Sequence, residues 1–114
     1  MTTEIRIRKA PGVWSVRSGG AVLGESSAAL ELSEGDLAPV IYFPREDLAM
    51  AFLDPSDKQT VCPHKGTASY FSIVTKSRTI EDAGWSYETP KDGVGEIAGH
   101  IAFATSDLVM VEEV

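Results

Sequence analysis

Short runs in which apolar and polar residues alternate, separated by turn-forming residues, make up most of the chain. A period of two is typical of a strand with one buried face. In the first half the pattern predicts strands at 5–8, 13–17, 21–25 and 40–43. In the second half it predicts strands at 60–62, 68–75 and 84–87, followed by apolar segments at 97–104 and 108–111. Residues 26–32 fit either a helix or a strand.

The breaks between these runs have the composition of turns. Gly19-Gly20 suits a tight hairpin because either glycine can adopt a positive φ. Turns are also predicted at 33–36 and 64–66, and a loop at 89–95. No strand–helix–strand alternation is visible, so a doubly wound nucleotide-binding fold is not expected.

One segment, near residues 45–53, predicts a short α-helix. Pro44 suits a first helical turn, and an acidic pair follows it where a helix N-terminus favours anions. Leu48, Ala51 and Phe52 then share a face at helical spacing, and a proline stops the pattern at 55. We therefore expect a mainly β, compact fold over residues 1–114: a single-domain antiparallel sandwich or barrel-like structure with one short α-helix.

Charge and length narrow the classes of protein. The chain has 114 residues with 10 basic and 17 acidic side chains, a net charge of −7 that argues against a nucleic-acid binder. No apolar run approaches the ~18 residues of a membrane span, and the N-terminus lacks the apolar centre of a signal peptide, so a cytoplasmic location is expected. Residues 1–17 hold four basic side chains against Glu4. They fit a solvated strand face, or a contact with an anionic partner.

Two cations and three aromatic residues suggest a ligand pocket. Arg45 offers a rigid fork of donors for an anion, and Lys65, beside a turn glycine, offers a mobile point charge. Tyr70, Trp85 and Tyr87 would form an aromatic wall with polar groups left for hydrogen bonds. The competing interpretation is structural: Arg45 pairs with a nearby carboxylate and the aromatic residues fill the core.

Cys62 and the two histidines offer further candidate chemistry. Cys62 would be a nucleophile only as a thiolate beside a cation such as Lys65, whereas a lone strand cysteine is commonly a small buried hydrophobe. His100, within an apolar segment, would act as an acid or base, or serve as a hydrogen-bonded structural residue. His64, His100 and Cys62 have no metal-binding spacing, so no metal or other cofactor is expected. A single cysteine also forms no intramolecular disulfide.

Four sequence stretches carry a family resemblance. They are 42–47 (Tyr-Phe-Pro-Arg-Glu-Asp), 62–70 (Cys-Pro-His-Lys-Gly-Thr-Ala-Ser-Tyr), 85–87 (Trp-Ser-Tyr) and 97–103 (Ile-Ala-Gly-His-Ile-Ala-Phe). Their order and spacing resemble the bacterial family called domain of unknown function 427, over nearly the whole chain. The resemblance implies a compact β-rich fold like the β-tent domains of zinc-bearing exchange factors and methionine sulfoxide reductases. Those relatives bind zinc through four cysteines, a site that Cys62 alone does not form.

These observations favour a small cytoplasmic domain that binds a small anionic or polar molecule. Arg45 and Lys65 would anchor it, with Tyr70, Trp85, Tyr87 and His100 lining the pocket. The alternatives are a non-catalytic protein-interaction module and an enzyme of unknown reaction. The pocket hypothesis predicts that Arg45, Lys65, Tyr87 and His100 converge on one concavity. The sequence specifies neither catalytic residues nor an oligomeric state.

Overall fold

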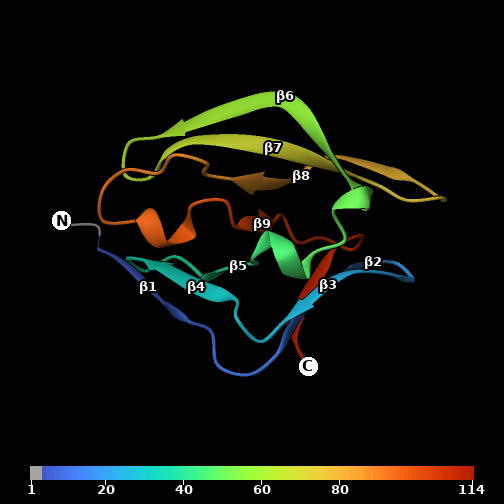
Figure 1. The fold of residues 1–114 in the computed structure, drawn as a ribbon, viewed down its shortest axis with the longest axis horizontal. Helices are drawn as coiled ribbons and strands as arrows, with labels where there is room; N and C mark the ends of the chain where they lie inside the picture. The colour runs from blue at the N-terminus through green and yellow to red at the C-terminus, as the bar shows by residue number, and fades with distance from the viewer. Residues whose placement is uncertain (1–3) are drawn as a thin grey trace.

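Three antiparallel sheets hold the strands of the computed structural model, which describes residues 4–114 (Figure 1). One sheet has the order β1 (Ile5–Lys9), β4 (Leu30–Glu34), β5 (Val40–Tyr42). A second has the order β10 (Met110–Glu113), β2 (Trp14–Ser18), β3 (Ala21–Ser26). The third has the order β6 (Leu53–Cys62), β7 (Gly66–Val74), β8 (Thr79–Ser86), β9 (Ile101–Phe103). The prediction of a mainly β, antiparallel fold is confirmed.

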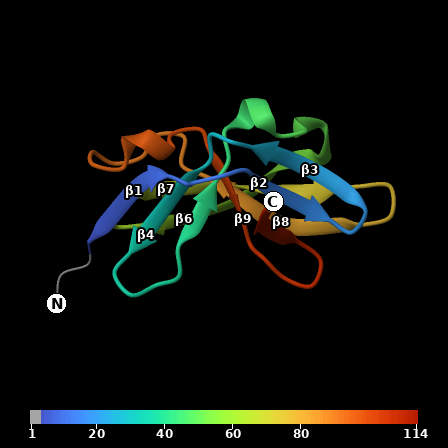
Figure 2. The same ribbon diagram turned by 90° about the horizontal axis from the view of Figure 1, so that it is seen from below.

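The four-stranded sheet forms one layer, and the two smaller sheets together form a second layer that faces it (Figures 1 and 2). A short bridge ties the layers together at the end of β5, where Phe43 and Ile101 exchange backbone hydrogen bonds of 2.8 and 2.9 Å. Phe43 is fully buried there and meets Phe103 edge-to-face, with ring centroids 6.1 Å apart. This junction fixes β5 against β9 and so sets the distance between the layers.

Two groups of buried side chains fill the space between the sheets. The larger packs around Phe43, Leu23 and Ile73, beneath the sheet formed by β10, β2 and β3. The smaller includes Tyr42 and Tyr87, with Ile5 and Ile7 of β1 packed against it. The smaller cluster therefore contains two tyrosines, whose hydroxyl groups need partners or a route to solvent.

The α-helix expected near 45–53 is absent from the described residues; two 3₁₀ helices replace it, η1 (Arg45–Asp47) and η2 (Met50–Phe52). Between them Leu48 is extended, at φ −109° and ψ 145°, and bridges Gly24, while the Ala49 amide donates to the Leu23 carbonyl at 2.7 Å. A Cβ on Gly24 would lie 2.6 Å from the Asp47 carbonyl oxygen, so the glycine permits this approach. Pairing with β3 overrides the helical spacing.

Strand boundaries differ most where the hydrophobic pattern is weak. β6 begins at Leu53 and passes through Pro55, although only 60–62 is predicted as strand. Most of its side chains are exposed, so alternation gives little signal, and a proline is tolerated because β6 is an edge strand. Residues 97–104 form only the short β9, preceded by the 3₁₀ helix η3 (Gly95–Ile97). The Gly19-Gly20 hairpin is confirmed between β2 and β3.

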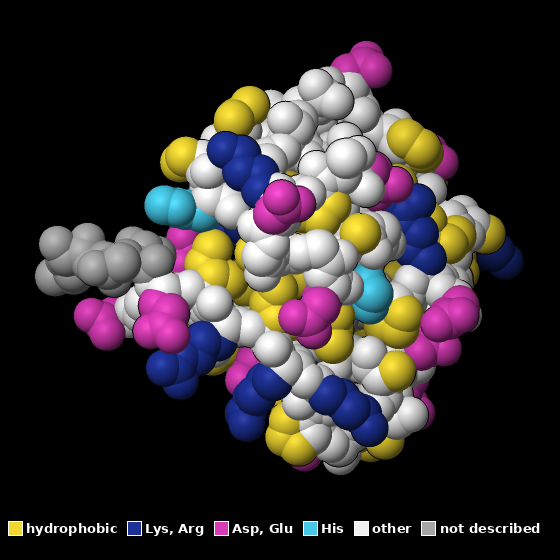
Figure 3. Space-filling view, turned by 60° about the vertical axis from the view of Figure 1, so that its left-hand side comes forward, with side chains coloured by type: hydrophobic (Ala, Val, Ile, Leu, Met, Phe, Trp, Pro, Cys, Tyr) yellow, Lys and Arg dark blue, Asp and Glu magenta, His cyan; other side chains and the backbone are white. Residues whose placement is uncertain are grey.

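The three arginines near the N-terminus, Arg6, Arg8 and Arg17, each pair with a carboxylate. Arg8 Nε lies 2.8 Å from Glu31 Oε1, and Arg6 Nε lies 3.1 Å from Glu4 Oε1. Figure 3 shows a face on which Lys and Arg side chains are interspersed with Asp and Glu. Within residues 4–114, no helix is both long and apolar enough to cross a membrane.

Candidate functional site

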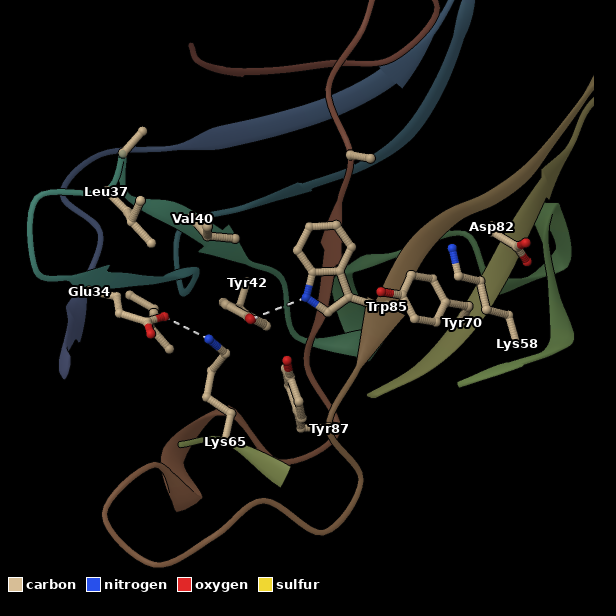
Figure 4. A pocket seen from close by; sticks show the side chains of 13 residues that line it. Glu34, Leu37, Val40, Tyr42, Lys58, Lys65, Tyr70, Asp82, Trp85 and Tyr87 are labelled. Carbon is tan, nitrogen blue, oxygen red and sulfur yellow. Dashed lines mark hydrogen bonds and ion pairs between the residues drawn. The ribbon is translucent and has the colours of Figure 1, made fainter. Parts of the chain in front are cut away.

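A cavity of about 400 Å³ opens between the β1-β4-β5 sheet and the four-stranded sheet. Its walls come from β4, the loop before β5, β5 itself, the turn between β6 and β7, and the facing strands β7 and β8. Four of the residues expected at a ligand site line it, Lys65, Tyr70, Trp85 and Tyr87, with Glu34 and Tyr42 opposite (Figure 4). The volume is within the usual range for small-molecule sites.

Strand register explains why the aromatic residues meet. Tyr70 of β7 pairs with Trp85 of β8, so their side chains lie next to each other, with ring centroids 6.3 Å apart. Successive side chains of a strand point to opposite faces. Trp85 and Tyr87 therefore line the cavity, and Ser86 between them points to the other face of the sheet, where it is fully buried.

The turn between β6 and β7 positions Lys65. Its amide donates to the Cys62 carbonyl at 3.3 Å, and Gly66 follows at φ 114°, a conformation that favours glycine. The 89–95 loop supports the turn from outside: the Lys91 amide donates to the Lys65 carbonyl at 3.0 Å, and Lys91 Nζ donates to the Pro63 carbonyl at 2.8 Å. The turn that holds the Lys65 ammonium at the cavity is thus stabilised by hydrogen bonds from the 89–95 loop.

Lys65 forms an ion pair with Glu34, the last residue of β4, at 2.7 Å between Nζ and Oε1. Both side chains are mostly buried, with exposed fractions of 13% and 16%. Burial lowers the pKa of Lys65, but the hydrogen bond to Glu34 and the nearby Tyr87 and Cys62 outweigh it, and the pKa is raised. The ammonium is therefore a permanent donor at neutral pH.

Two tyrosine hydroxyls complete this side of the cavity. Trp85 Nε1 donates to the Tyr42 hydroxyl at 3.2 Å, which fixes the indole plane. Burial raises the pKa of Tyr42, and burial raises the pKa of Tyr87 to about 12. The Tyr87 hydroxyl has no hydrogen-bond partner among the side chains that line the cavity (Figure 4). Both phenols stay protonated at neutral pH and serve as hydrogen-bonding groups.

The end of the cavity away from Lys65 is polar. Lys58 Nζ lies 4.8 Å from the centroid of the Tyr70 ring, and the Tyr70 hydroxyl lies 3.1 Å from Thr60 Oγ1. Asp82, at φ 53°, accepts a hydrogen bond from Ser56. Lys58 and Asp82 lie beside Tyr70 at this end of the aromatic wall (Figure 4).

Arg45 and His100 do not join the cavity. The Arg45 guanidinium donates through Nε to the Gly99 carbonyl at 2.8 Å and through one terminal nitrogen to Ser86 Oγ at 3.4 Å and to the Glu88 carboxylate. His100 Nδ1 donates to the Ala98 carbonyl at 3.2 Å. The expected convergence of Arg45 and His100 with Lys65 and Tyr87 is thus not seen. Arg45 contacts Ser86, whose side chain points to the face of β8 opposite to the cavity.

Other candidate residues fall beside the cavity or away from it. Cys62 is half-buried, packs against the smaller core cluster, and does not line the cavity. His64 is exposed in the neighbouring turn. Sequence reasoning missed Glu34, which it read only as part of a turn, and Tyr42, which it read as a strand residue. No local signal connects the turn at 33–36 with Lys65, 31 positions later.

Fold and site together define a small antiparallel β domain with a polar and aromatic cavity between its sheets. The chain belongs to the family described as domain of unknown function DUF427, whose model matches residues 6–114. The resemblance noted in the sequence is thereby confirmed. Comparison with curated protein sequences returned no match.

Proposed function

We propose that this domain binds a small polar or anionic ligand in the cavity lined by Lys65, Tyr70, Trp85 and Tyr87. The observation that carries the proposal is the Lys65–Glu34 pair, which is mostly buried and lines the cavity. Apolar walls with a few convergent polar groups are the usual make-up of a ligand site. Tyr42 and Tyr87 add hydroxyl groups beside the pair.

The energetics of the ion pair favour a binding role over a purely structural one. Desolvating two charges is costly, and replacing such a pair by apolar residues of similar size is often neutral or stabilising. An ammonium has three N–H donors, and Glu34 accepts from Lys65. A ligand oxygen facing Lys65 would use a further donor in a low-dielectric setting, where hydrogen bonds to charged groups are strong.

Arg45 and His100 are left out of the proposed site. The Arg45 guanidinium already donates to three acceptors on the other face of β8. Arg45 does not line the cavity that holds Lys65. We therefore assign the ligand contacts to Lys65 and the aromatic residues, and assign Arg45 a role in holding β8 to the segment before β9.

A thermal-shift screen tests the proposal, with nucleotides, sugar phosphates, organic acids and small neutral amides as probes. A compound that binds only the native state raises its melting temperature by mass action. Each hit is repeated with Lys65→Met, which we expect to abolish the shift, and with Arg45→Met as matched control, which we expect to retain it. A shift that persists in Lys65→Met would reject the assignment, as would the absence of any hit.

A further inference from the structure

A second hollow continues the cavity on the far side of Trp85. It has a volume of about 600 Å³. Four residues line both spaces: Ala38, Val40, Trp85 and Ala104. Because these residues lie in the common wall, the two spaces are neighbours across the indole. A ligand that extends from Lys65 across this shared boundary would reach the second hollow.

The two spaces differ in chemistry. The second hollow is mainly apolar, with Trp14, Ile41, Phe103 and Val111 in its walls, and it holds no basic side chain. Its one acidic residue, Glu31, is engaged elsewhere, since Glu31 Oε1 accepts from Arg8 Nε at 2.8 Å. The first cavity, by contrast, holds the Lys65–Glu34 pair and the tyrosine hydroxyls.

We propose, building on the ligand site above, that the ligand is a neutral amphipathic molecule. Its head is an amide-type group at Lys65 and Glu34, and its apolar chain lies in the second hollow. The inference rests on the proposed function and adds the chemical class of the ligand. It commits to one molecule that spans both spaces.

The paired charges select the head group. Lys65 Nζ and Glu34 Oε1 are 2.7 Å apart, so a donor and an acceptor stand side by side at the cavity wall. An amide matches them, because its carbonyl oxygen accepts from the ammonium while its N–H donates to the carboxylate. A carboxylate or phosphate head would face the Glu34 carboxylate at close range, and like charges brought together are unfavourable. A neutral head with both functions is therefore preferred to an anion.

The second hollow selects the rest of the molecule. Transfer of an apolar chain from water into apolar surroundings is favourable in proportion to the area removed from water. Trp85 offers its indole to both spaces, and its bond to the Tyr42 hydroxyl holds it in one orientation. The indole thus marks the boundary between the head and the chain of the ligand.

Isothermal titration calorimetry on the full chain tests the inference with hexanamide, octanamide and decanamide, and with the carboxylates of the same chain lengths. One buried methylene corresponds to about fourfold in affinity, so we expect the amide affinity to rise by roughly that factor per carbon. At each length we expect the amide to bind at least about tenfold more tightly than the carboxylate, by the cost of placing two anions together. Lys65→Met should weaken all three amides by a similar factor.

Thr105→Phe tests the second hollow alone, because Thr105 lines that hollow and not the first cavity. We expect it to remove the dependence on chain length and to leave hexanamide binding nearly unchanged. Thr79→Phe, at an exposed position of β8 outside both spaces, is the matched control and should keep the dependence. Val111→Phe, from another wall of the same hollow, should repeat the result if Thr105→Phe unfolds.

The outcomes separate this inference from the proposed function. Affinity that does not rise with chain length, while hexanamide still requires Lys65, would overturn the apolar subsite and leave the polar site standing. Carboxylates that bind as tightly as amides would overturn the neutral head group. A length dependence that persists in Thr105→Phe and Val111→Phe would place the chain elsewhere and overturn the inference. Binding of none of the six compounds would overturn it as well, with the proposed function then judged by its own screen.

Discussion

Arg45 and Lys65 are cations in the two most distinctive stretches of the sequence, and each is paired with a glutamate, yet their surroundings differ. Arg45 reaches a backbone carbonyl, the buried Ser86 hydroxyl and Glu88, and its guanidinium carbon lies 5.3 Å from the centroid of the Phe71 ring. Lys65 reaches Glu34 at the wall of a cavity. Arg45 donates to protein groups away from the cavity, whereas Lys65 lies at the cavity wall.

The difference shows that cations in two distinctive sequence stretches can have different roles in one β domain. The guanidinium of Arg45 donates to Gly99 and to Glu88, so it links the end of β8 to the segment at Gly99. The ammonium of Lys65 keeps donors for a ligand and has aromatic residues around it. Arg45 and Lys65 lie on opposite faces of the sheet near the end of β8. Successive side chains alternate there, so Ser86 points to one face while Trp85 and Tyr87 point to the other.

Loss of Arg45 should have the largest effect on stability. Arg45→Met removes the donors of the Gly99 carbonyl and the buried Ser86 hydroxyl, and hydrogen bonds to a charged group are worth about 1.5–3 kcal/mol. We expect the free energy of unfolding in urea to fall by about 3 kcal/mol. Arg6→Met, which removes only an exposed ion pair with Glu4, should change it by less than about 1 kcal/mol.

A second variant of Arg45 separates the role of its charge from that of its planar fork. Arg45→Lys keeps the charge but loses the planar fork, so it should recover less than half of the lost stability. Equal stability of Arg45→Lys and the wild type would show that the charge alone matters, and the contrast with Lys65 would then lose its basis.

Substitution of Lys65 should lower the free energy of unfolding by less, and a second substitution at Glu34 should restore it. Lys65→Met leaves Glu34 charged and poorly hydrated, and we expect a loss of about 2 kcal/mol, below the range for a fully buried pair because the cavity admits water. The double variant Lys65→Met, Glu34→Met should return to within about 1 kcal/mol of the wild type. Urea unfolding of both measures this recovery. A double variant as unstable as the single one would make the ion pair structural.

The sequence predicted the two anchors equally well and had no means of separating them. Strands at 68–75 and 84–87 and the turn at 64–66 follow from alternation and glycine placement, and these elements position Lys65, Tyr70, Trp85 and Tyr87. The partners do not follow. Glu34 and Glu88 are 31 and 43 positions from the cations they meet, and pairing of that kind depends on how the sheets are stacked.

The segment after Pro44 teaches the same lesson about local signals. Its proline, acidic residues and helical spacing are real, yet Leu48 and Ala49 pair with β3 instead. Tertiary hydrogen bonds overrode a propensity worth only a few tenths of a kcal/mol per residue. For β6 the predicted strand, 60–62, was too short. Most side chains of β6 are exposed, so the burial pattern that reveals a strand is missing.

Tyr42→Phe should have a smaller effect, confined to the cavity. It leaves Trp85 Nε1 without its acceptor, which we expect to cost about 1 kcal/mol in urea unfolding. The emission of Trp85 should shift as the indole N–H loses its partner. Tyr70→Phe is the control: its hydroxyl meets the exposed Thr60, and its loss should cost less than about 0.5 kcal/mol. An equal cost for both would mean that the Trp85–Tyr42 bond does not fix the indole.

The last expected effect distinguishes the two regions by pH. Burial raises the pKa of Tyr87 from 10.0 to about 12, so the unfolded chain loses this proton first as pH rises. Between these values the unfolded state binds fewer protons than the native state, and stability falls with increasing pH. Unfolding in urea at pH 9.5, 10.5 and 11.5 should therefore show a shallower decline for Tyr87→Phe than for the wild type. Tyr42 and Lys65, whose pKa values are also raised, leave a residual decline in that variant. Arg45→Met should keep the wild-type slope, since Arg45 does not contribute to the raised pKa values of these three groups. A slope altered by Arg45→Met but not by Tyr87→Phe would reverse the assignment.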